Sequence, residues 1–275
     1  MPIEFTKMHG IGNDFIVINA IDEPMPFDAQ EIRRLSHRRF GIGFDQLLVV
    51  EPASTPAAEF NYRIYNADGG EVENCGNGAR CFARYVRDKG LTKSDRIPVM
   101  TSAGPMTLAI NNDGQVTVAM EKPQLHPDNV PFVAEAEATQ YELAVDSEML
   151  SVGVAAVGNP HVVLPVASVD SAPVERLGPL IETHERFPNR VNVGFMQVMQ
   201  RDEIALRVFE RGVGETLACG TGACAAVVVG INQGLLDKRV TVHLRGGDLD
   251  VHWADYESAV MMTGPCETVF EGRLE

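Results

Sequence analysis

The sequence predicts an α+β fold in two pseudo-symmetric domains, each a curled, mostly antiparallel sheet around one central helix. Three observations support this prediction. A motif pattern occurs twice in the chain, short strand-like segments lack regular strand–helix alternation, and one helical segment is apolar on every side. The length of 275 residues accommodates two domains of ordinary size.

The repeat is clearest around two cysteines. Cys75-Gly76-Asn77-Gly78-Ala79 recurs as Cys219-Gly220-Thr221-Gly222-Ala223, an offset of 144 residues. Arg63-Ile64-Tyr65-Asn66 corresponds to Arg207-Val208-Phe209-Glu210 at the same offset. Further pairs lie at nearly this offset: Gly12-Asn13 with Gly158-Asn159, and Gly104 with Gly247. Several matches in one order favour duplication over chance similarity between glycine-rich stretches.

Alternating and β-branched segments predict the strands. These segments are 16–18, 47–50, 60–65, 106–110, 116–120, 162–164, 204–209 and 240–244. Asn112-Asp113-Gly114 is a hairpin signal between two of them. Helices are expected at 30–40, 75–89, 174–186 and 219–233. Alanine, valine and isoleucine cover every side of the last segment, so it is predicted to be a buried helix.

A polar stretch with three prolines, residues 121–131, is typical of a linker and predicts the domain boundary. The N-terminal half is therefore expected to span 1–120, and the C-terminal half 121–263. The remaining tail, 264–275, is expected to return and pair with the first half.

Charge and cysteine usage exclude several classes of partner. Lys and Arg total 23 against 38 Asp and Glu, a formal net charge of −15, so binding to nucleic acid or to an anionic membrane surface is not expected. The start of the chain lacks the blocks of a signal peptide, and the longest apolar run, 223–231, is too short to span a bilayer. The odd count of five cysteines does not indicate a secreted disulfide scaffold, which favours a reducing cytoplasm.

The chemistry is expected at the two helix starts that Cys75 and Cys219 precede. Unpaired N–H groups at a helix N-terminus favour negative charge, hold carboxylates, and can lower a thiol pKa to roughly 3.5–7.5. Two such ends related by an approximate two-fold axis would face each other across one substrate carbon. One thiolate could then remove an α-proton while the opposite thiol returns a proton to the other face.

Other interpretations of these residues remain open. The two cysteines could form a disulfide, or bind zinc together with Cys81 and Cys224, although the spacings are longer than the Cys-x2-Cys of zinc ribbons. Cys81 and Cys224 are otherwise interpreted as small buried side chains. Asparagines at glycine turns are often turn formers, Glu210-Arg211 could be a solvated surface pair, and His161 could be structural.

Several blocks of the chain resemble the diaminopimelate epimerase family, from one end of the sequence to the other. The blocks are Asn66-Ala67-Asp68-Gly69, Asn74-Cys75-Gly76-Asn77-Gly78-Ala79-Arg80-Cys81, Glu210-Arg211-Gly212-Val213-Gly214-Glu215-Thr216 and Ala218-Cys219-Gly220-Thr221-Gly222. Shorter matches include His9-Gly10, Asn13-Asp14-Phe15, Asp45-Gln46, Gly158-Asn159-Pro160-His161 and Asn192. The resemblance implies a cytoplasmic, homodimeric isomerase that needs no cofactor or metal. Such an enzyme converts LL-diaminopimelate to meso-diaminopimelate in lysine and peptidoglycan precursor synthesis.

The resemblance also implies the roles of residues. Cys75 and Cys219 would be the acid/base pair, with Cys219 accepting and Cys75 donating a proton in the LL-to-meso direction. The residues implied to bind substrate are Asn13, Gln46, Asn66, Gly76, Asn77, Asn159, Asn192, Glu210, Arg211, Gly220 and Thr221. His161 and Glu210 would tune the thiols, and Phe270 would lie at a dimer contact. This chain has Gly70 where the family usually has Ser, and Phe270 where it often has Tyr.

Two rival functions are weighed against this one. The proline racemase and hydroxyproline epimerase family resembles the same two-cysteine design, but a cyclic imino acid has no distal ammonium and carboxylate to occupy Glu210 and Arg211. A redox or metal-binding protein could use the same thiols. A catalytically silent binding protein is disfavoured, because both halves retain the cysteine.

Overall fold

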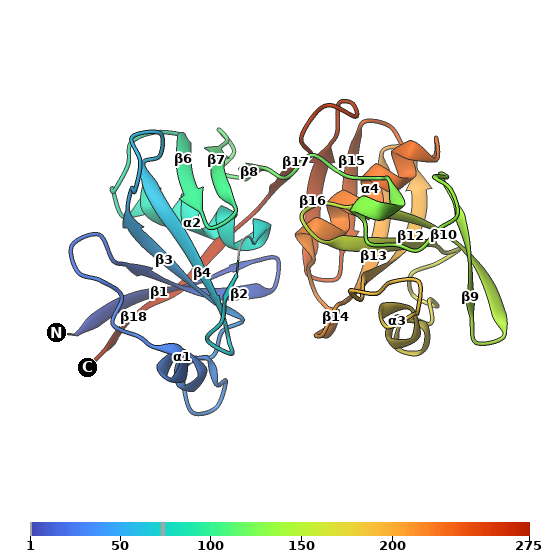
Figure 1. Cartoon of the computed structure of the whole chain (residues 1–275). Helices are drawn as coiled ribbons and strands as arrows, with labels where there is room; N and C mark the ends of the chain where they lie inside the picture. Colours follow the sequence, from blue (N-terminus) through green and yellow to red (C-terminus); the bar gives the residue numbers. More distant parts are fainter. Residues whose placement is uncertain (1, 73–74) are drawn as a thin grey trace. The chain divides into compact units, whose positions relative to one another are not determined.

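The structure is a computed structural model that describes residues 2–72 and 75–275, and it divides into two compact units (Figure 1). The first unit contains the described residues up to Ala119 together with Thr263–Glu275, and the second is Met120–Met262. Asn74, which belongs to one of the family-like blocks, lies outside the described residues.

The first unit is a curled sheet in the order β18–β1–β2–β3–β4–β6–β7–β8, with β5 beside β4. Only the β2–β3 and β4–β6 pairs in this order are parallel. The strands are β1 (Ile3–Gly10), β2 (Asn13–Asn19), β3 (Gln46–Pro52), β4 (Phe60–Asn66), β5 (Glu71–Val72), β6 (Arg96–Thr101), β7 (Gly104–Ile110), β8 (Val116–Ala119) and β18 (Glu267–Leu274). Helix α2 (Gly76–Asp88) contacts strands from both ends of the sheet, so the sheet curls around it. Helix α1 (Ala29–Ser36) packs on the outer face.

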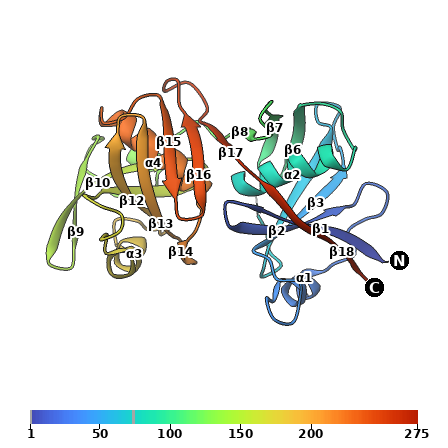
Figure 2. The ribbon, with the colours of Figure 1, turned by 180° about the vertical axis from the view of Figure 1, so that it is seen from behind.

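The second unit repeats this plan in the order β9–β10–β11–β12–β13–β15–β16, with β14 beside β13. The strands are β9 (Tyr141–Val145), β10 (Glu148–Ala156), β11 (Pro160–Pro165), β12 (Asn192–Gln200), β13 (Glu203–Glu210), β14 (Gly214–Thr216), β15 (Arg239–Leu244) and β16 (Gly247–His252). Helix α4 (Gly220–Asn232) contacts β10, β11, β12, β13 and β16, and α3 (Val174–Glu182) covers the outer face. A short 3-10 turn, η1 (Pro127–Asn129), opens the unit. The chain returns to the first unit through β17 (Met261–Gly264) and then pairs β18 with β1 (Figure 2).

The duplication predicted from the sequence extends to the register of the strands. In the first unit Phe15 of β2 lies opposite Gln46 of the parallel strand β3. In the second unit His161 of β11 lies opposite Asn192 of β12, and both residues are 146 positions further along the chain. Helices α2 and α4 each have 13 residues and each begin directly after a cysteine. The predicted α+β fold of two similar halves is therefore confirmed.

Most predicted elements are present, with two helices shorter than expected. The helix expected at 30–40 ends at Ser36, because His37 is extended and Leu35 O accepts hydrogen bonds from Ile42 N and Gly43 N. The helix expected at 174–186 ends at Glu182. The predicted burial of the last helix is confirmed, since Gly220 and every residue from Gly222 to Gly230 of α4 is buried. Within the described residues, no helix has the length and apolar character needed to cross a bilayer.

Candidate active site

In the first unit the candidate site centres on Cys75, the N-cap of α2. Its extended backbone (φ −150°, ψ 108°) turns the side chain back over the helix start, where Sγ accepts a hydrogen bond from Gly78 N at 3.4 Å. Only glycine fits at position 78, because an added Cβ would lie 2.5 Å from Tyr62 Oη. The close packing of α2 against β4 therefore fixes where the thiol sits.

Amide side chains surround this thiol. Asn13 opens β2 after a turn with positive φ at Ile11 and Gly12, and its Oδ1 lies 3.9 Å from Cys75 Sγ. The same oxygen accepts a hydrogen bond from Asn77 Nδ2 at 3.3 Å. The structure therefore brings together three residues that the family resemblance implies, contributed by β2 and by the start of α2.

Gln46 and Asn66 lie opposite each other on β3 and β4, and Gln46 Nε2 donates to Asn66 Oδ1 at 2.8 Å. Gln46 Oε1 and Asn77 Oδ1 are buried amide oxygens that have no hydrogen-bond partner among the described residues. An unsatisfied buried acceptor costs about 1–3 kcal/mol. Both oxygens are thus suited to receive N–H donors from a ligand.

In the second unit Cys219 occupies the equivalent place before α4, with an extended backbone (φ −127°, ψ 103°). Its Sγ lies 3.7 Å from Thr221 Oγ1, and the residue is only 4% exposed. Burial and then the nearby Glu210 carboxylate raise the pKa of Cys219 well above its usual value, against the opposing effect of Thr221 and Gly222. A helix N-terminus can lower the pKa of a thiol, but at Cys219 burial acts in the opposite direction and is the larger effect.

Glu210 is the last residue of β13 and Arg211 directly follows it, and the two residues have different partners. Glu210 Oε1 accepts a hydrogen bond from Thr216 Oγ1 at 2.5 Å, which fixes the carboxylate on the Cys219 side. Arg211 N donates to Asn192 Oδ1 at 3.0 Å, and Arg211 Nη1 donates to Asn189 O at 3.0 Å. Asn192, the first residue of β12, is thereby held beside the turn that begins at Arg211.

His161 is a buried neutral histidine. Burial, and to a lesser degree Arg211, lowers the pKa of His161 to about 3. Its Nε2 lies 2.8 Å from Asn159 Oδ1, an acceptor, so the ring proton is assigned to Nε2. Nδ1 is then an acceptor, and it has no hydrogen-bond partner among the described residues. His161 Nδ1 is thus a further buried acceptor, in the second unit.

Comparison with known proteins decides the family. The sequence profile of diaminopimelate epimerase matches residues 5–126 and 153–269. The chain belongs to the diaminopimelate epimerase family. Diaminopimelate epimerases from Thioalkalivibrio sulfidiphilus and Chromobacterium violaceum are 60% and 56% identical to it, and each match covers 100% of both chains. The predicted family and the predicted isomerase class are therefore confirmed.

More distant solved structures share the fold of this diaminopimelate epimerase family member. A Bacillus anthracis protein of the PhzF phenazine biosynthesis family has a TM-score of 0.72 at 17% identity, covering 100% of this chain and 99% of its own. A hydroxyproline epimerase from Agrobacterium vitis has a TM-score of 0.71 at 17% identity, covering 99% and 92%. At this level of identity the likeness concerns the architecture alone.

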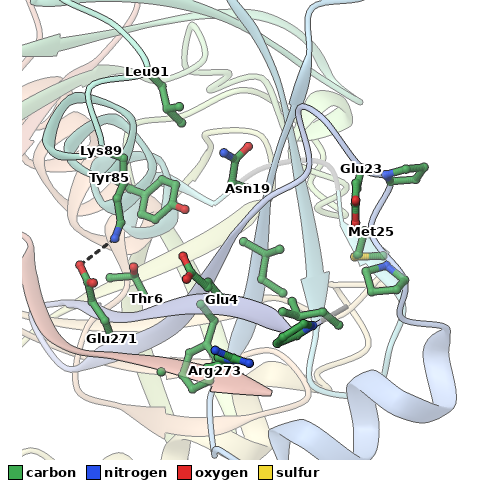
Figure 3. Close-up of a pocket in the computed structure, with 17 residues that line it drawn as sticks. Glu4, Thr6, Asn19, Glu23, Met25, Tyr85, Lys89, Leu91, Glu271 and Arg273 are labelled. Carbon is green, nitrogen blue, oxygen red and sulfur yellow. Dashed lines mark hydrogen bonds and ion pairs between the residues drawn. The ribbon is translucent and has the colours of Figure 1, made fainter. Parts of the chain in front are cut away.

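A cavity of the first unit lies away from the predicted site residues. It has a volume of about 750 Å³ and is lined by β1, β18, the end of α2 and the 23–26 loop (Figure 3). Lys89 and Glu271 form a 2.7 Å ion pair at its edge, and none of the predicted site residues lines it. Phe270 lies on β18, 46% exposed, with its ring edge-on to Phe5. Within 2–72 and 75–275, no group of three or more His, Cys, Asp or Glu side chains is arranged to hold a metal ion.

A charged network lies beside Asn13 and was not predicted from the sequence. Asp14 and Asp45 accept hydrogen bonds from Arg38, and Asp14 also accepts one from Lys7 at 2.5 Å. The sequence did offer one indication of this network, because Asp14 and Asp45 lie inside the family-like blocks that carry Asn13 and Gln46. The contact between Thr216, at the end of β14, and Glu210 was also not predicted, because a single hydroxyl carries no sequence signal of its own.

Proposed function

We propose that this chain interconverts LL- and meso-diaminopimelate by proton transfer at one α-carbon, with Cys75 and Cys219 as the two acid/base groups. The observation that carries the proposal is the equivalence of the two thiols. Each cysteine stands at the N-cap of the central helix of its unit, followed by Gly-x-Gly. The mechanism requires that both sulfurs reach a single carbon from opposite sides.

The reaction balances as two proton transfers. A thiolate removes the α-hydrogen as a proton, leaving the electron pair on the α-carbon and its carboxylate, and the opposite thiol protonates the other face. The N–H groups at the starts of α2 and α4 would stabilise this charge, with Gly76, Asn77, Gly220 and Thr221 around the carboxylate. A stabilising interaction that strengthens as charge develops is what accelerates the step.

The remaining polar residues would bind the rest of the substrate. The unsatisfied acceptors Gln46 Oε1, Asn77 Oδ1 and His161 Nδ1 suit ammonium donors. Asn13, Asn66, Asn159, Asn192, Glu210 and Arg211 supply further donors and acceptors for the two ends of a diamino diacid. A cyclic imino acid would leave part of this set unmatched, which favours diaminopimelate over hydroxyproline as the substrate.

The two directions of the epimerisation start from different protonation states of Cys75 and Cys219. Because the pKa of Cys219 is raised, this residue rests as a thiol at neutral pH and is ready to donate. The LL-to-meso direction, with Cys219 accepting and Cys75 donating, needs the other arrangement of protons. The form with a Cys219 thiolate becomes more populated as pH rises.

Single cysteine variants test the assignment. Cys75→Ala and Cys219→Ala should each lower LL-diaminopimelate epimerisation by at least about 1,000-fold, within the range of a lost general acid or base. Cys224→Ala is a matched control, since it removes a buried thiol from the same helix as Cys219 without touching the proposed chemistry. The wild type should turn over diaminopimelate and not trans-4-hydroxy-L-proline. Wild-type-like epimerisation by either single variant would refute the two-base assignment.

Assembly and location complete the proposal. We propose a cytoplasmic homodimer in which Phe270, exposed on β18, contributes to the contact between protomers. The strand offers an apolar side chain at a sheet edge, and burial of such a residue stabilises association.

A further inference from the structure

We propose that Asp45 is a positioning residue whose carboxylate fixes the side-chain amide of Asn13 with its oxygen, rather than its NH₂ group, toward Cys75. The inference rests on the proposed role of Cys75 as a proton-transfer group. Asp45 itself acts only through Asn13, so it is distinct from the residues proposed above to bind substrate.

The orientation of the Asn13 amide follows from hydrogen-bond chemistry. Asn13 Nδ2 donates to Asp45 Oδ2 at 2.9 Å. An ionised carboxylate has acceptors only, so the amide group that faces it must be the NH₂. Turning the amide over would place two oxygens against each other. Asn13 Oδ1 is therefore directed away from Asp45, 3.9 Å from Cys75 Sγ and 3.3 Å from Asn77 Nδ2.

Asp45 is held in place by its own donors. Oδ2 also accepts from Asp14 N at 3.1 Å, and Oδ1 accepts from Arg38 Nη2 at 2.7 Å. Arg38 makes two further bonds to Asp14, at 3.0 and 2.8 Å. Burial alone would raise the pKa of Asp14, but its bonds to Arg38 and Lys7 hold that pKa well below the usual range. Asp14 and Arg38 therefore stay charged throughout the pH range of an enzyme assay, and Arg38 keeps its bond to Asp45.

The fixed orientation of the Asn13 amide shifts the protonation equilibrium of Cys75. An acceptor oxygen near the sulfur favours the thiol, whereas an NH₂ group in its place would favour the thiolate. The second unit has no equivalent carboxylate, because Val191 occupies the position that corresponds to Asp45 in the repeat. The carboxylate therefore distinguishes the Cys75 half of the site from the Cys219 half.

A double-mutant cycle tests this inference. Asp45→Ala and Asn13→Ala should each lower kcat/KM for LL-diaminopimelate, by about 10-fold for a lost hydrogen bond to a charged group. The double variant should have the same kcat/KM as Asn13→Ala, because the Asp45 carboxylate acts on the site only through Asn13. Asp45→Asn should recover part of the activity, since its amide oxygen can still accept from Asn13. Asp88→Ala is the control: it also removes a carboxylate paired with an arginine, at the far end of α2, and should leave kcat/KM unchanged.

Alkylation of Cys75 by iodoacetamide supplies a readout independent of catalysis. In a Cys219→Ala background, Asp45→Ala should move the half-maximal alkylation of Cys75 to lower pH, and Asp88→Ala should not move it. Tyr62 and Cys81 also interact electrostatically with Cys75, but burial raises the pKa of each, so neither is ionised in the same range. Fully additive losses in the cycle, or an unmoved alkylation profile, would overturn the inference. If the wild type does not epimerise diaminopimelate, the proposed function fails and the alkylation profile alone decides the role of Asp45.

Discussion

Replacing Gly78 with Ala is a sharp perturbation of the helix start that holds Cys75. A Cβ at this position would lie 2.5 Å from Tyr62 Oη and 3.1 Å from Leu48 Cδ2, where an ordinary contact begins at 3.4 Å. Tyr62 is 1% exposed and its ring packs 4.5 Å from that of Phe82, so it has little room to yield. The start of α2 must therefore move by about 0.9 Å, and Cys75 with it.

The expected magnitudes follow from this displacement. Overpacking of this kind costs about 1–3 kcal/mol, and the better helix propensity of alanine offsets about 1 kcal/mol. At about 2–4 °C per kcal/mol, the melting temperature should fall by a few degrees. A misplacement near 1 Å costs about 100-fold in rate, so kcat/KM for LL-diaminopimelate should fall by about that factor.

The assay compares this variant with Gly230→Ala. That substitution also overpacks a central helix, here against Leu236 at the far end of α4 from Cys219. Calorimetry should record a lowered melting temperature for both variants, whereas chiral chromatography of the product should record a rate loss for Gly78→Ala only. Equal losses of rate per folded molecule in the two variants would refute the reasoning, as would unchanged kcat/KM in Gly78→Ala.

Three further perturbations have defined outcomes. Glu210→Gln removes the negative charge that helps to raise the pKa of Cys219, so alkylation of Cys219 in a Cys75→Ala background should begin at lower pH; an unmoved profile would contradict this electrostatic role. The pKa of His161 is depressed to about 3, so the unfolded chain takes up a proton below about pH 6.5 that the folded protein does not. The free energy of unfolding measured by urea titration should therefore decrease as pH falls toward 3. The decrease should be steeper in the wild type than in His161→Gln, by up to about 1.4 kcal/mol per pH unit. Parallel curves for the two proteins would contradict this role of His161. Phe270→Glu should shift the sedimenting species from dimer to monomer, and an unchanged dimer would exclude Phe270 from the contact.

Local patterns in the sequence predicted the central elements well because their signals are short-range. The continuous Ala, Val and Ile positions of α4 predicted a buried helix, and Asn112-Asp113-Gly114 predicted the β7–β8 hairpin. The tail 264–275 was expected to return to the first half, but β18 gave no local signal for its register: six of its eight residues are exposed, and its partners on β1 are more than 250 positions away. A pairing of that kind is decided by tertiary context rather than by local propensity.

In the candidate site too, features with a local sequence signal were predicted and contacts between distant residues were not. The repeat placed both cysteines at helix starts, because glycine spacing is visible in one dimension. It did not predict the raised pKa of Cys219, which depends on burial by the surrounding sheet and on Glu210. Nor did it predict that Asp45 would contact Asn13, since these residues are 32 positions apart and are joined only by the pairing of β2 with β3.

The origin of the new α-hydrogen tests the central claim most directly. LL-diaminopimelate would be incubated with the wild type in heavy water, and product and remaining substrate would be separated at low conversion and analysed by mass spectrometry. Two thiols acting on opposite faces should give meso-diaminopimelate with one deuterium at the inverted carbon, while the unreacted LL isomer stays unlabelled. Product that keeps the original hydrogen would mean that a single group removes and returns the proton, and would contradict the account.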